Sequence, residues 1–411
     1  MRKVRKDTKG RPLHCGEIYR KSKGLYCYSY IDPLGKRRYL YAHGLDELRE
    51  KEKRVKKDTL DGINKYAFAQ SDINFAFDRY ISTRTTLRGS TLSNYLRTYN
   101  RHVREVFGKR KLAEVNYSDV LLYYNSLLNE KKLSLSTIDT VHILLYSTFE
   151  MAVRDSVIRL NPTRSVMREL KKKVEGRPEP RHALTIEQER AFLQFVQKEE
   201  YARWKPLFTV MFGTGCRIGE ILGLRWKDID FKNNTISINH CLTYYPKTDK
   251  DYRCEYAIHR TKTESGTRVI PMLEKVKEAF LEEKEIQERT GHHCIAEIDG
   301  MKDFVFCNRF GGLLNCESVN TVIKRIVGDH NASEEVIAVR EDREPVIIPM
   351  FSCHITRHTF CTRLCENETN IKVIQYVMGH KDIKTTMNIY AEVTESKKQE
   401  IFKQLNSENI F

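Results

Sequence analysis

The sequence of 411 residues lacks the marks of a membrane or secreted protein. No window of about 18 residues is free of charged side chains, which excludes a helix that spans a membrane. The basic N-terminal segment, residues 1–11, is not followed by an apolar run, so it does not have the form of a secretion signal. We therefore expect a cytoplasmic protein that does not contact a membrane.

Spacings typical of metal sites are also missing. The eleven cysteines include no C-x-x-C pair, and a disulfide framework does not suit a long chain without a secretion signal. Cys361 and Cys365 are spaced as on one face of a helix, and His292–Cys294 has no partner pair at zinc-ligand spacing. We expect reduced, mostly buried thiols and no metal site.

Positive charge is what the chain has in excess. Lys and Arg number 71 against 55 Asp and Glu, which gives a net charge of +16. Residues 1–60 hold 18 of these basic residues and only 8 acidic ones, so most of the surplus lies there. A field of this sign favours polyanions, nucleic acid first. The length predicts two or three domains, and a hydrophobic content of 40% predicts a globular chain.

The first 65 residues predict a small folded domain in preference to a disordered basic arm. Aromatic and small side chains alternate in residues 25–31, as in a strand, and residues 36–42 follow as a second strand after an Asp-Pro-Leu-Gly turn. We expect a third strand at residues 17–20 and a charged helix at 45–60. Such a sheet can enter the major groove of DNA. Its candidate DNA contacts are Arg20, Lys21, Lys23, Lys36, Arg37 and Arg38.

The rest of the chain divides at a basic connector that contains Pro and Gly. Before it, residues 71–174 have helical periodicity throughout and predict four helices, with Ser90 and Ser136 as expected N-caps. After it, residues 181–411 alternate helical patterns with short strand patterns. We expect a multidomain α+β protein whose last domain is mostly helical, with a small antiparallel sheet.

That last domain is expected to hold strands at residues 235–245, 256–259 and 268–272. A helix is expected at 316–327, and residues 331–349 have the character of an insertion.

Five short motifs in the last domain carry arginine, lysine, histidine and tyrosine. In chain order they are TGCRIGE (214–220), TKTESGTR (261–268), HITRHT (354–359), MGH (378–380) and NIY (388–390). Each alone has an ordinary explanation, such as a surface ion pair, a solvated lysine at a hairpin tip, or a helix C-cap. Together, with no carboxylate cluster for Mg²⁺, they suit attack on a phosphodiester in which basic side chains stabilise the developing charge.

In this order, the motifs resemble the tyrosine recombinase family, and most closely the integrases of conjugative transposons and phages. The resemblance covers nearly the whole chain. It implies an arm-type DNA-binding domain at 1–65, a four-helix SAM-like core-binding domain at 71–174 and a catalytic domain at 181–411. It also implies a site-specific recombinase that cuts and rejoins DNA through a 3′-phosphotyrosyl intermediate, to integrate and excise a mobile element. That chemistry needs no metal and no nucleotide cofactor.

The resemblance assigns the phosphate clamp to two arginines, Arg217 and Arg357. Glu220 matches an acidic position that supports the first arginine. Guanidinium suits this task because it is planar and binds phosphate oxygens in pairs. One departure is Cys216, which stands where larger apolar residues are usual.

The resemblance assigns proton transfer and attack to the other motif residues. Lys262 is implied to be the general acid that protonates the departing 5′ oxygen, and Tyr390 the nucleophile. His354 and His380 are implied to hydrogen-bond the phosphate and assist proton transfer. His358 is expected to be packed, with no catalytic role.

The implied partners are double-stranded DNA at core and arm sites, a homotetramer on that DNA, and an excisionase or a host DNA-bending protein. The amphipathic tail, residues 398–411, is expected to dock either on its own catalytic domain or on a neighbouring protomer. A regulator that has lost cleavage is disfavoured because all six candidate catalytic residues are present. A type IB topoisomerase is disfavoured by the separate basic N-terminal domain, and a nucleoid protein would need neither Tyr390 nor Lys262.

Overall fold

The computed structural model describes residues 5–31, 37–60, 71–173, 182–248, 252–260, 266–367 and 370–391. The chain divides into two compact units, Met1–Arg177 and Pro178–Phe411, which are described separately. Their mixed content of helices and small antiparallel sheets confirms the predicted α+β class. Within the described ranges, no helix is long and apolar enough to cross a membrane. All eleven cysteines fall in these ranges, and each is a free thiol.

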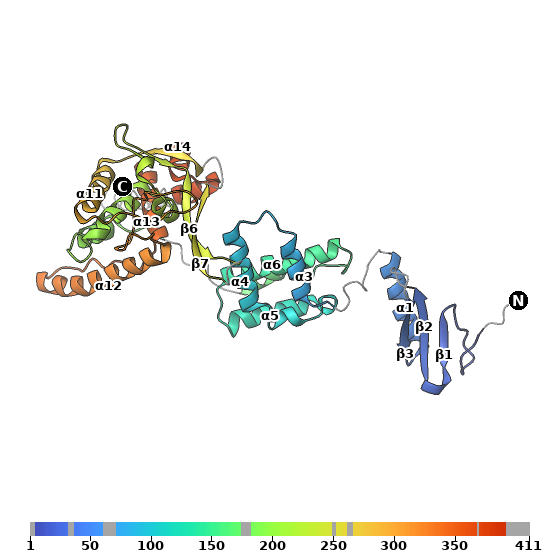
Figure 1. The fold of residues 1–411 in the computed structure, drawn as a ribbon. Coiled ribbons are helices and arrows are strands. Elements are labelled where there is room, and N and C mark those ends of the chain that lie inside the picture. The colour runs from blue at the N-terminus through green and yellow to red at the C-terminus, as the bar shows by residue number, and fades with distance from the viewer. Residues whose placement is uncertain are drawn as a thin grey trace. The chain divides into compact units, whose positions relative to one another are not determined.

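The N-terminal segment forms the expected sheet and helix (Figure 1). The strands are β1 (Glu17–Arg20), β2 (Leu25–Ile31) and β3 (Arg37–Ala42), antiparallel in the order β1-β2-β3, and α1 (Leu45–Leu60) follows them. Because side chains alternate along a strand, Tyr26 and Tyr28 lie on one face of β2, where they pack against Leu45 and Leu48 of α1. The predicted turn at 32–35 falls outside the described residues.

The helical part of the first unit contains α3 (Ile73–Ser82), α4 (Gly89–His102), α5 (Tyr117–Asn129), α6 (Leu135–Arg154) and α7 (Val166–Lys173). The four predicted helices are confirmed, with α7 added. Helix α6 supplies much of the core, and side chains such as Leu144 and Phe149 are fully buried. Both expected N-caps are wrong. Helix α4 begins after Arg88, whose side chain makes no cap bond, and Ser134 caps α6 by accepting a hydrogen bond from the Thr137 amide.

The second unit is mostly helical. Its helices are α8 (Ile186–Phe195), α9 (Lys205–Thr214), α10 (Ile218–Leu222), α11 (Glu274–Thr290), α12 (Cys316–Glu341), α13 (Cys353–Asn367) and α14 (Ile371–Met378), and residues 383–391 are also helical. Helix α9 lies in the core, where Phe208, Val210 and Met211 are buried. Seven of its ten residues are buried, as expected of a helix covered by its neighbours.

The strands of this unit form two small sheets. They are β4 (Ile229–Asp230), β5 (Thr235–Ile238), β6 (His240–Pro246), β7 (Cys254–Arg260) and β8 (Arg268–Pro271), paired as β4-β5-β8 and β6-β7. The run predicted at 235–245 is therefore two strands, β5 and β6, separated by Asn239. Ile238 pairs with Arg268, and His240 pairs with Arg260.

The pairing of the described strands joins β8 to β5 and β7 to β6. Strands β6 and β7 pair from His240↔Arg260 to Pro246↔Cys254, and β5 and β8 pair from Thr235↔Pro271 to Ile238↔Arg268. The hairpin tip predicted to carry Lys262 lies in residues 261–265, outside the described ranges.

Helix α12 extends well past its predicted end at residue 327. It continues to Glu341, so the first part of the insertion expected at 331–349 is helical. The following segment folds back along the helix. Arg343 pairs with Glu334 at 2.5 Å, and the Asn331 side chain exchanges two 2.9 Å hydrogen bonds with the backbone of Ile348.

Candidate active site

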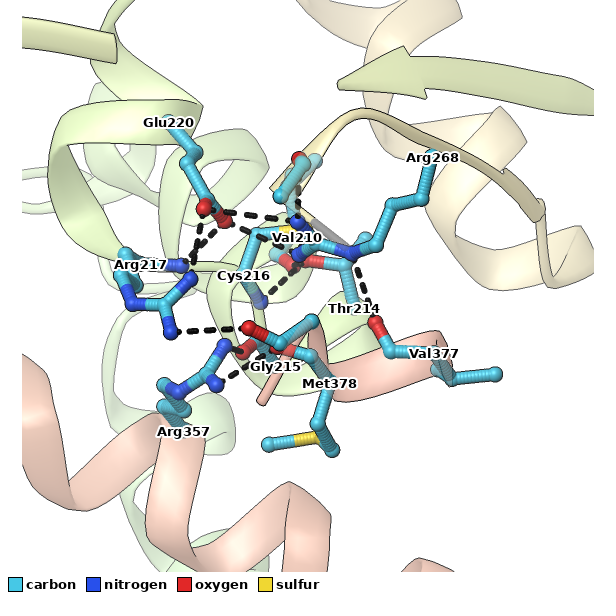
Figure 2. A network of polar contacts seen from close by, with 12 residues as sticks. Val210, Thr214, Gly215, Cys216, Arg217, Glu220, Arg268, Arg357, Val377 and Met378 are labelled. Atoms are coloured by element: carbon cyan, nitrogen blue, oxygen red, sulfur yellow. Dashed lines mark hydrogen bonds and ion pairs between the residues drawn. The ribbon is translucent and has the colours of Figure 1, made fainter. Parts of the chain in front are cut away.

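The first clamp arginine, Arg217, lies where α9 ends and α10 begins. Gly215 ends α9 in the left-handed conformation (φ 57°), and Arg217 then occupies the N-cap of α10. Its Nη1 donates to Oε1 of Glu220 at 2.9 Å, and its backbone amide donates to Oε2 at 3.0 Å (Figure 2). Its Nη2 donates to the carbonyl of Gly379 at 3.0 Å. The expected support of Arg217 by Glu220 is therefore present.

The second clamp arginine, Arg357, lies on α13 and is only 4% exposed. Its Nη1 and Nη2 donate to the carbonyls of Gly215 and Met378, at 2.8 and 2.6 Å (Figure 2). Burial, and then the charge of Arg217, lower the pKa of Arg357 to about 10, so the guanidinium remains charged at neutral pH. Both arginines thus bind carbonyls at the C-terminal ends of α9 and α14, where the helix dipole is negative.

Glu220 is buried between Arg217 and a third arginine, Arg268. Its Oε2 accepts a 2.9 Å bond from Nη2 of Arg268, whose side chain is completely buried. Burial alone would raise the pKa of the Glu220 carboxyl, but the hydrogen bond and charge of Arg268, together with the charge of Arg217, lower it. The carboxylate is therefore ionised at neutral pH.

His380 follows directly after α14. Gly379 ends that helix in the left-handed conformation (φ 61°), as the MGH motif predicts. The ring of His380 is buried, and its Nδ1 lies 2.9 Å from the hydroxyl of Thr386. Burial and the charges of Arg357 and Arg217 lower the pKa of His380 to about 4. The imidazole is therefore neutral in the free protein at pH 7.

A pocket of about 900 Å³ opens over these groups. Its lining includes four of the candidate catalytic residues, which are Arg217, His354, Arg357 and His380. His354 is exposed in the first turn of α13, and Arg357 is buried one turn later, so the two differ in exposure although they share a motif. His358, expected to be packed, is half-buried and also lines the pocket.

Tyr390 lies beside this pocket. It is half-buried and packs against Cys361, Cys365 and Met378, while its neighbours Ile389 and Ala391 line the pocket. Of the described lining residues only Asp382 is acidic, against two arginines, Lys381 and three histidines. The pocket is therefore positive and suits a phosphate group. The roles of these residues in catalysis stay predictions at this point.

Two residues in the network were not assigned from the sequence. Arg268 stands in the TKTESGTR motif, but nothing in its spacing shows that it reaches Glu220. Thr386 precedes the NIY motif, and its bond to His380 depends on how the helix at 383–391 returns to α14. The alternation of side chains along the predicted strand at 268–272 places Arg268 on its inward side. A basic residue in that position needs a buried partner, so a partner for Arg268 could have been expected.

The candidate DNA contacts of the N-terminal sheet do not all share one face. Arg20 and Arg37 lie on the open face, away from α1, and both are exposed. The guanidinium of Arg20 lies 5.6 Å from the ring centroid of Tyr41, which is on the same face. Lys21 and Lys23 are exposed in the turn between β1 and β2. All four of these basic residues are exposed.

Arg38 lies on the opposite face of this sheet. It lies opposite Tyr30 in the strand pairing, and it is on the same side of β3 as Leu40, two residues later. Tyr30 and Leu40 both pack toward α1. Arg37 and Arg38 therefore point to opposite sides of the sheet, as adjacent strand residues do, and their roles as DNA contacts stay predictions. Lys36 falls outside the described residues.

One group in the N-terminal sheet has the geometry of a metal site. His14, Glu17 and Glu52 place one ligand atom each within 4.8 Å of one another. Glu17 is ion-paired with Arg49 at 3.1 Å, and Glu52 with Lys56. Because cationic side chains already neutralise both carboxylates, the group is better explained as a buried ion-pair network than as a metal site.

Two family models match the sequence. The phage integrase family matches residues 182–397, and the DNA binding domain of Tn916 integrase matches residues 1–59. The first match covers more than half of the chain. The chain belongs to the phage integrase family.

Known relatives resemble the chain over nearly its full length. The transposase from transposon Tn916 of Enterococcus faecalis and that from Tn1545 of Streptococcus pneumoniae are each 30% identical to it, over 99% of this chain and 98% of theirs. The Tn1549 transposon integrase, solved in complex with circular intermediate DNA, is 29% identical. It has a TM-score of 0.67 and covers 80% of this chain and 99% of its own. The protein is thus an integrase of the conjugative transposon type, a tyrosine recombinase that cleaves and rejoins DNA at specific sites.

The fold extends to a more distant recombinase. The lambda integrase tetramer bound to a Holliday junction has a TM-score of 0.51 at 17% identity, over 91% of this chain and 94% of its own. At that identity the likeness shows a shared fold.

Proposed function

We propose that this integrase cuts and rejoins DNA with Tyr390 as nucleophile, Arg217 and Arg357 as phosphate clamp, Lys262 as general acid, and His354 and His380 as phosphate ligands. The observation that carries this assignment is the pair of guanidiniums fixed at the base of a positive pocket beside Tyr390. Arg357 is anchored by two backbone carbonyls, and Arg217 by one backbone carbonyl and one oxygen of Glu220.

The clamp retains donors for a ligand. A guanidinium has five N–H donors. In the described part of the chain, Arg357 uses two of them on carbonyls, and Arg217 uses one on Gly379 and one on Glu220. The remaining donors can bind two oxygens of a phosphodiester, and they bind more strongly as negative charge builds on those oxygens during attack.

In the proposed cleavage step, the Tyr390 oxygen forms a bond to phosphorus while the bond to the 5′ oxygen breaks. Tyr390 gives its proton to a histidine of the pocket, and Lys262 gives a proton to the departing 5′ oxygen. The 3′-phosphotyrosyl bond conserves the energy of the original phosphodiester. Attack by a 5′ hydroxyl of the partner strand reverses the step and rejoins DNA.

His380 supports the phosphate in this scheme as a neutral ring. The low pKa of His380 leaves it uncharged before DNA binds, so it can share a hydrogen bond with a phosphate oxygen and accept a proton as charge develops. Its bond to Thr386 fixes the ring orientation. His354, exposed at the rim of the pocket, would contact the same phosphate.

The proposed organisation on DNA follows the three predicted domains. Residues 1–65 bind arm sites, and residues 71–174 and residues 181–411 each bind the core site. Exchange between two duplexes uses four active sites, two at a time, so the working form is a homotetramer on DNA, assisted by an excisionase or a host DNA-bending protein. Residues 398–411 lie outside the described ranges, and their docking on their own catalytic domain or on a neighbouring protomer stays a prediction.

Covalent trapping tests the assignment of Tyr390. With nicked core-site DNA in the presence of EDTA, the wild-type protein should form an adduct that survives SDS, and Tyr390→Phe should form none while binding DNA with near-normal affinity. Tyr376→Phe is the matched control, because this exposed tyrosine on α14 lies close by and should keep the adduct. An adduct formed by Tyr390→Phe would refute the assignment.

A further inference from the structure

Two cysteines outside the pocket meet where α12 and α13 begin. Cys316 is the first residue of α12 and is exposed, whereas Cys353 is the first residue of α13 and is only 4% exposed. The thiol of Cys353 donates a hydrogen bond to the sulfur of Cys316. Two segments far apart in the chain thus bring a surface thiol and a buried thiol into direct contact.

The side-chain amide of Asn320 joins the two cysteines. Asn320 lies one turn into α12, and its Nδ2 donates to Sγ of Cys316 at 3.5 Å. Its Oδ1 accepts a 2.9 Å hydrogen bond from the backbone amide of Cys353. The start of each helix is therefore held at a fixed position relative to the other. A disulfide forms readily only between cysteines that the fold has already brought together in this way.

The exposed member of the pair is the reactive one, because oxidants react with a thiolate and not with a thiol. The hydrogen bonds from Cys353 and Asn320 lower the pKa of Cys316 to about 7, although partial burial and the charge of Glu317 oppose this change. The same hydrogen bond, and then burial, raise the pKa of Cys353. At neutral pH, Cys316 is therefore partly thiolate while Cys353 keeps its proton.

Cys353 is joined directly to the active site. His354 follows it in the chain, Arg357 lies one turn later on the same helix, and both line the pocket. A disulfide is shorter than a hydrogen bond between two thiols, so its formation draws the first turn of α13 toward α12. The two pocket residues move with that helix. A misplacement of ~1 Å can slow an enzyme about 100-fold.

We propose that Cys316 and Cys353 form a site of reversible thiol oxidation, and that the disulfide between them slows DNA cleavage. The oxidant class is a peroxide. The effect on cleavage rests on the proposed roles of His354 and Arg357, whereas formation of the disulfide does not. The two thiols are free in this structure, which is the reduced and active form of the pair.

The oxidation proceeds in two steps. The Cys316 thiolate attacks one oxygen of hydrogen peroxide and the O–O bond breaks, which gives a sulfenic acid and a hydroxide that takes up a proton to become water. The sulfur of Cys353 then attacks the sulfur of the sulfenic acid. An S–S bond forms, the S–O bond breaks, and the proton of Cys353 leaves with the hydroxyl as a second water. The thiols lose two electrons and the peroxide gains them, and a dithiol reductant reverses the change.

The first measurement maps the disulfide in the full-length protein. The protein is treated with hydrogen peroxide, its remaining thiols are alkylated, and its protease fragments are analysed by mass spectrometry. A fragment that links Cys316 to Cys353 should appear and should be lost after dithiothreitol. In Cys316→Ser, no linked fragment should contain Cys353. Absence of the link in the wild type, or links to other cysteines only, would refute the oxidation site.

The second measurement is single-turnover cleavage of nicked core-site DNA after the peroxide is removed with catalase. Oxidation should slow the wild type about tenfold or more, and dithiothreitol should restore its rate. Cys316→Ser, altered outside the pocket, should cleave at a near-normal rate before and after peroxide. Cys254→Ser is the matched control, because Cys254 is another exposed cysteine of this unit, and this variant should respond to peroxide as the wild type does.

The outcomes separate the new site from the proposed catalytic roles. If the disulfide forms but cleavage is unchanged, the control of cleavage is refuted. If peroxide slows Cys316→Ser as much as the wild type, the inactivation belongs to another thiol, such as Cys361 in the pocket lining, and the proposal falls. If His354→Ala cleaves DNA normally, the proposed role of His354 falls, while the mapped link still decides whether the oxidation site exists.

Discussion

The close packing of β6 on α10 makes Gly219→Ala a direct test of how the site is assembled. A Cβ on Gly219 would lie 2.6 Å from the backbone carbonyl oxygen of Leu242 in β6. Backbone cannot rotate away as a flexible side chain can, so helix and strand must separate. Helix α10 follows Arg217 and carries Glu220, and β6 pairs with β7, which leads to the Lys262 segment.

The expected change in unfolding free energy follows from this distance. Overpacking of this kind costs about 1–3 kcal/mol, whereas Ala in place of Gly within a helix gains about 1 kcal/mol. Gly328→Ala is the matched control, because Gly328 also lies in a helix but a Cβ there meets no atom within 4 Å. The difference in unfolding free energy between the two variants should therefore equal the cost of the clash, about 1–3 kcal/mol.

Intrinsic fluorescence is a suitable assay for the unfolding of this unit. Both tryptophans of the chain, Trp204 and Trp226, lie in the second unit. Gly328→Ala should unfold at a higher urea concentration than wild type, and Gly219→Ala at a lower concentration than Gly328→Ala. Cleavage of nicked DNA should fall about tenfold in Gly219→Ala, the rate change for 1.4 kcal/mol of barrier, and stay normal in Gly328→Ala. Equal stability and equal cleavage in the two variants would refute this account of the packing.

Three further predictions concern single side chains. Arg217→Lys should cleave DNA far more slowly than wild type although it keeps the charge, because an ammonium cannot bind Glu220, Gly379 and phosphate at once. The rate is measured by single-turnover cleavage. A normal rate would assign Arg217 a structural role only. The pKa of about 4 for His380 lies below its ordinary value of 6.5, so stability should be lost as pH falls from 6.5 toward 4, by up to ~3 kcal/mol. Fluorescence melts should show a smaller loss in His380→Gln, and an unchanged pH profile would count against the buried neutral ring. In the N-terminal sheet, Arg37→Ala should weaken arm-site binding and reduce by ~0.9 the slope of the logarithm of the binding constant against the logarithm of salt concentration. Arg38→Ala, on the other face, should change neither quantity. Equal effects of the two variants in a filter-binding titration would contradict the assignment of faces.

The sequence predicted those parts of the fold that depend on local pattern. Alternation of aromatic and small side chains identified β2, and the charged amphipathic run identified α1, because one face of each must be covered. The motif residues Arg217, Arg357 and His380 converge on one pocket, as their combined chemistry suggested.

The sequence did not predict features that depend on which segments pair. The break at Asn239 falls inside a uniform strand pattern, and only pairing with β7 and β8 shows that the two halves belong to different sheets. Ser136 and Ser134 are both plausible caps by residue type, and the choice depends on where α6 packs. Arg268 was missed for the same reason, since its carboxylate partner lies 48 residues earlier in the chain.

The choice of acceptors around the clamp explains how a site so rich in cations can be stable and still bind DNA. If carboxylates oriented each arginine, they would neutralise it and compete with phosphate for the same donors. Here Arg357 is held by two carbonyls, and Arg217 by one carbonyl and one oxygen of Glu220. Carbonyl dipoles orient a guanidinium yet leave its charge in place. Glu220 therefore pairs with two of the three arginines, Arg217 and Arg268, and the excess positive charge that destabilises the free protein becomes favourable when a phosphate enters. The buried position of Arg268 fits this scheme, because it holds Glu220 on the side away from the pocket and leaves the outer face of the clamp to DNA.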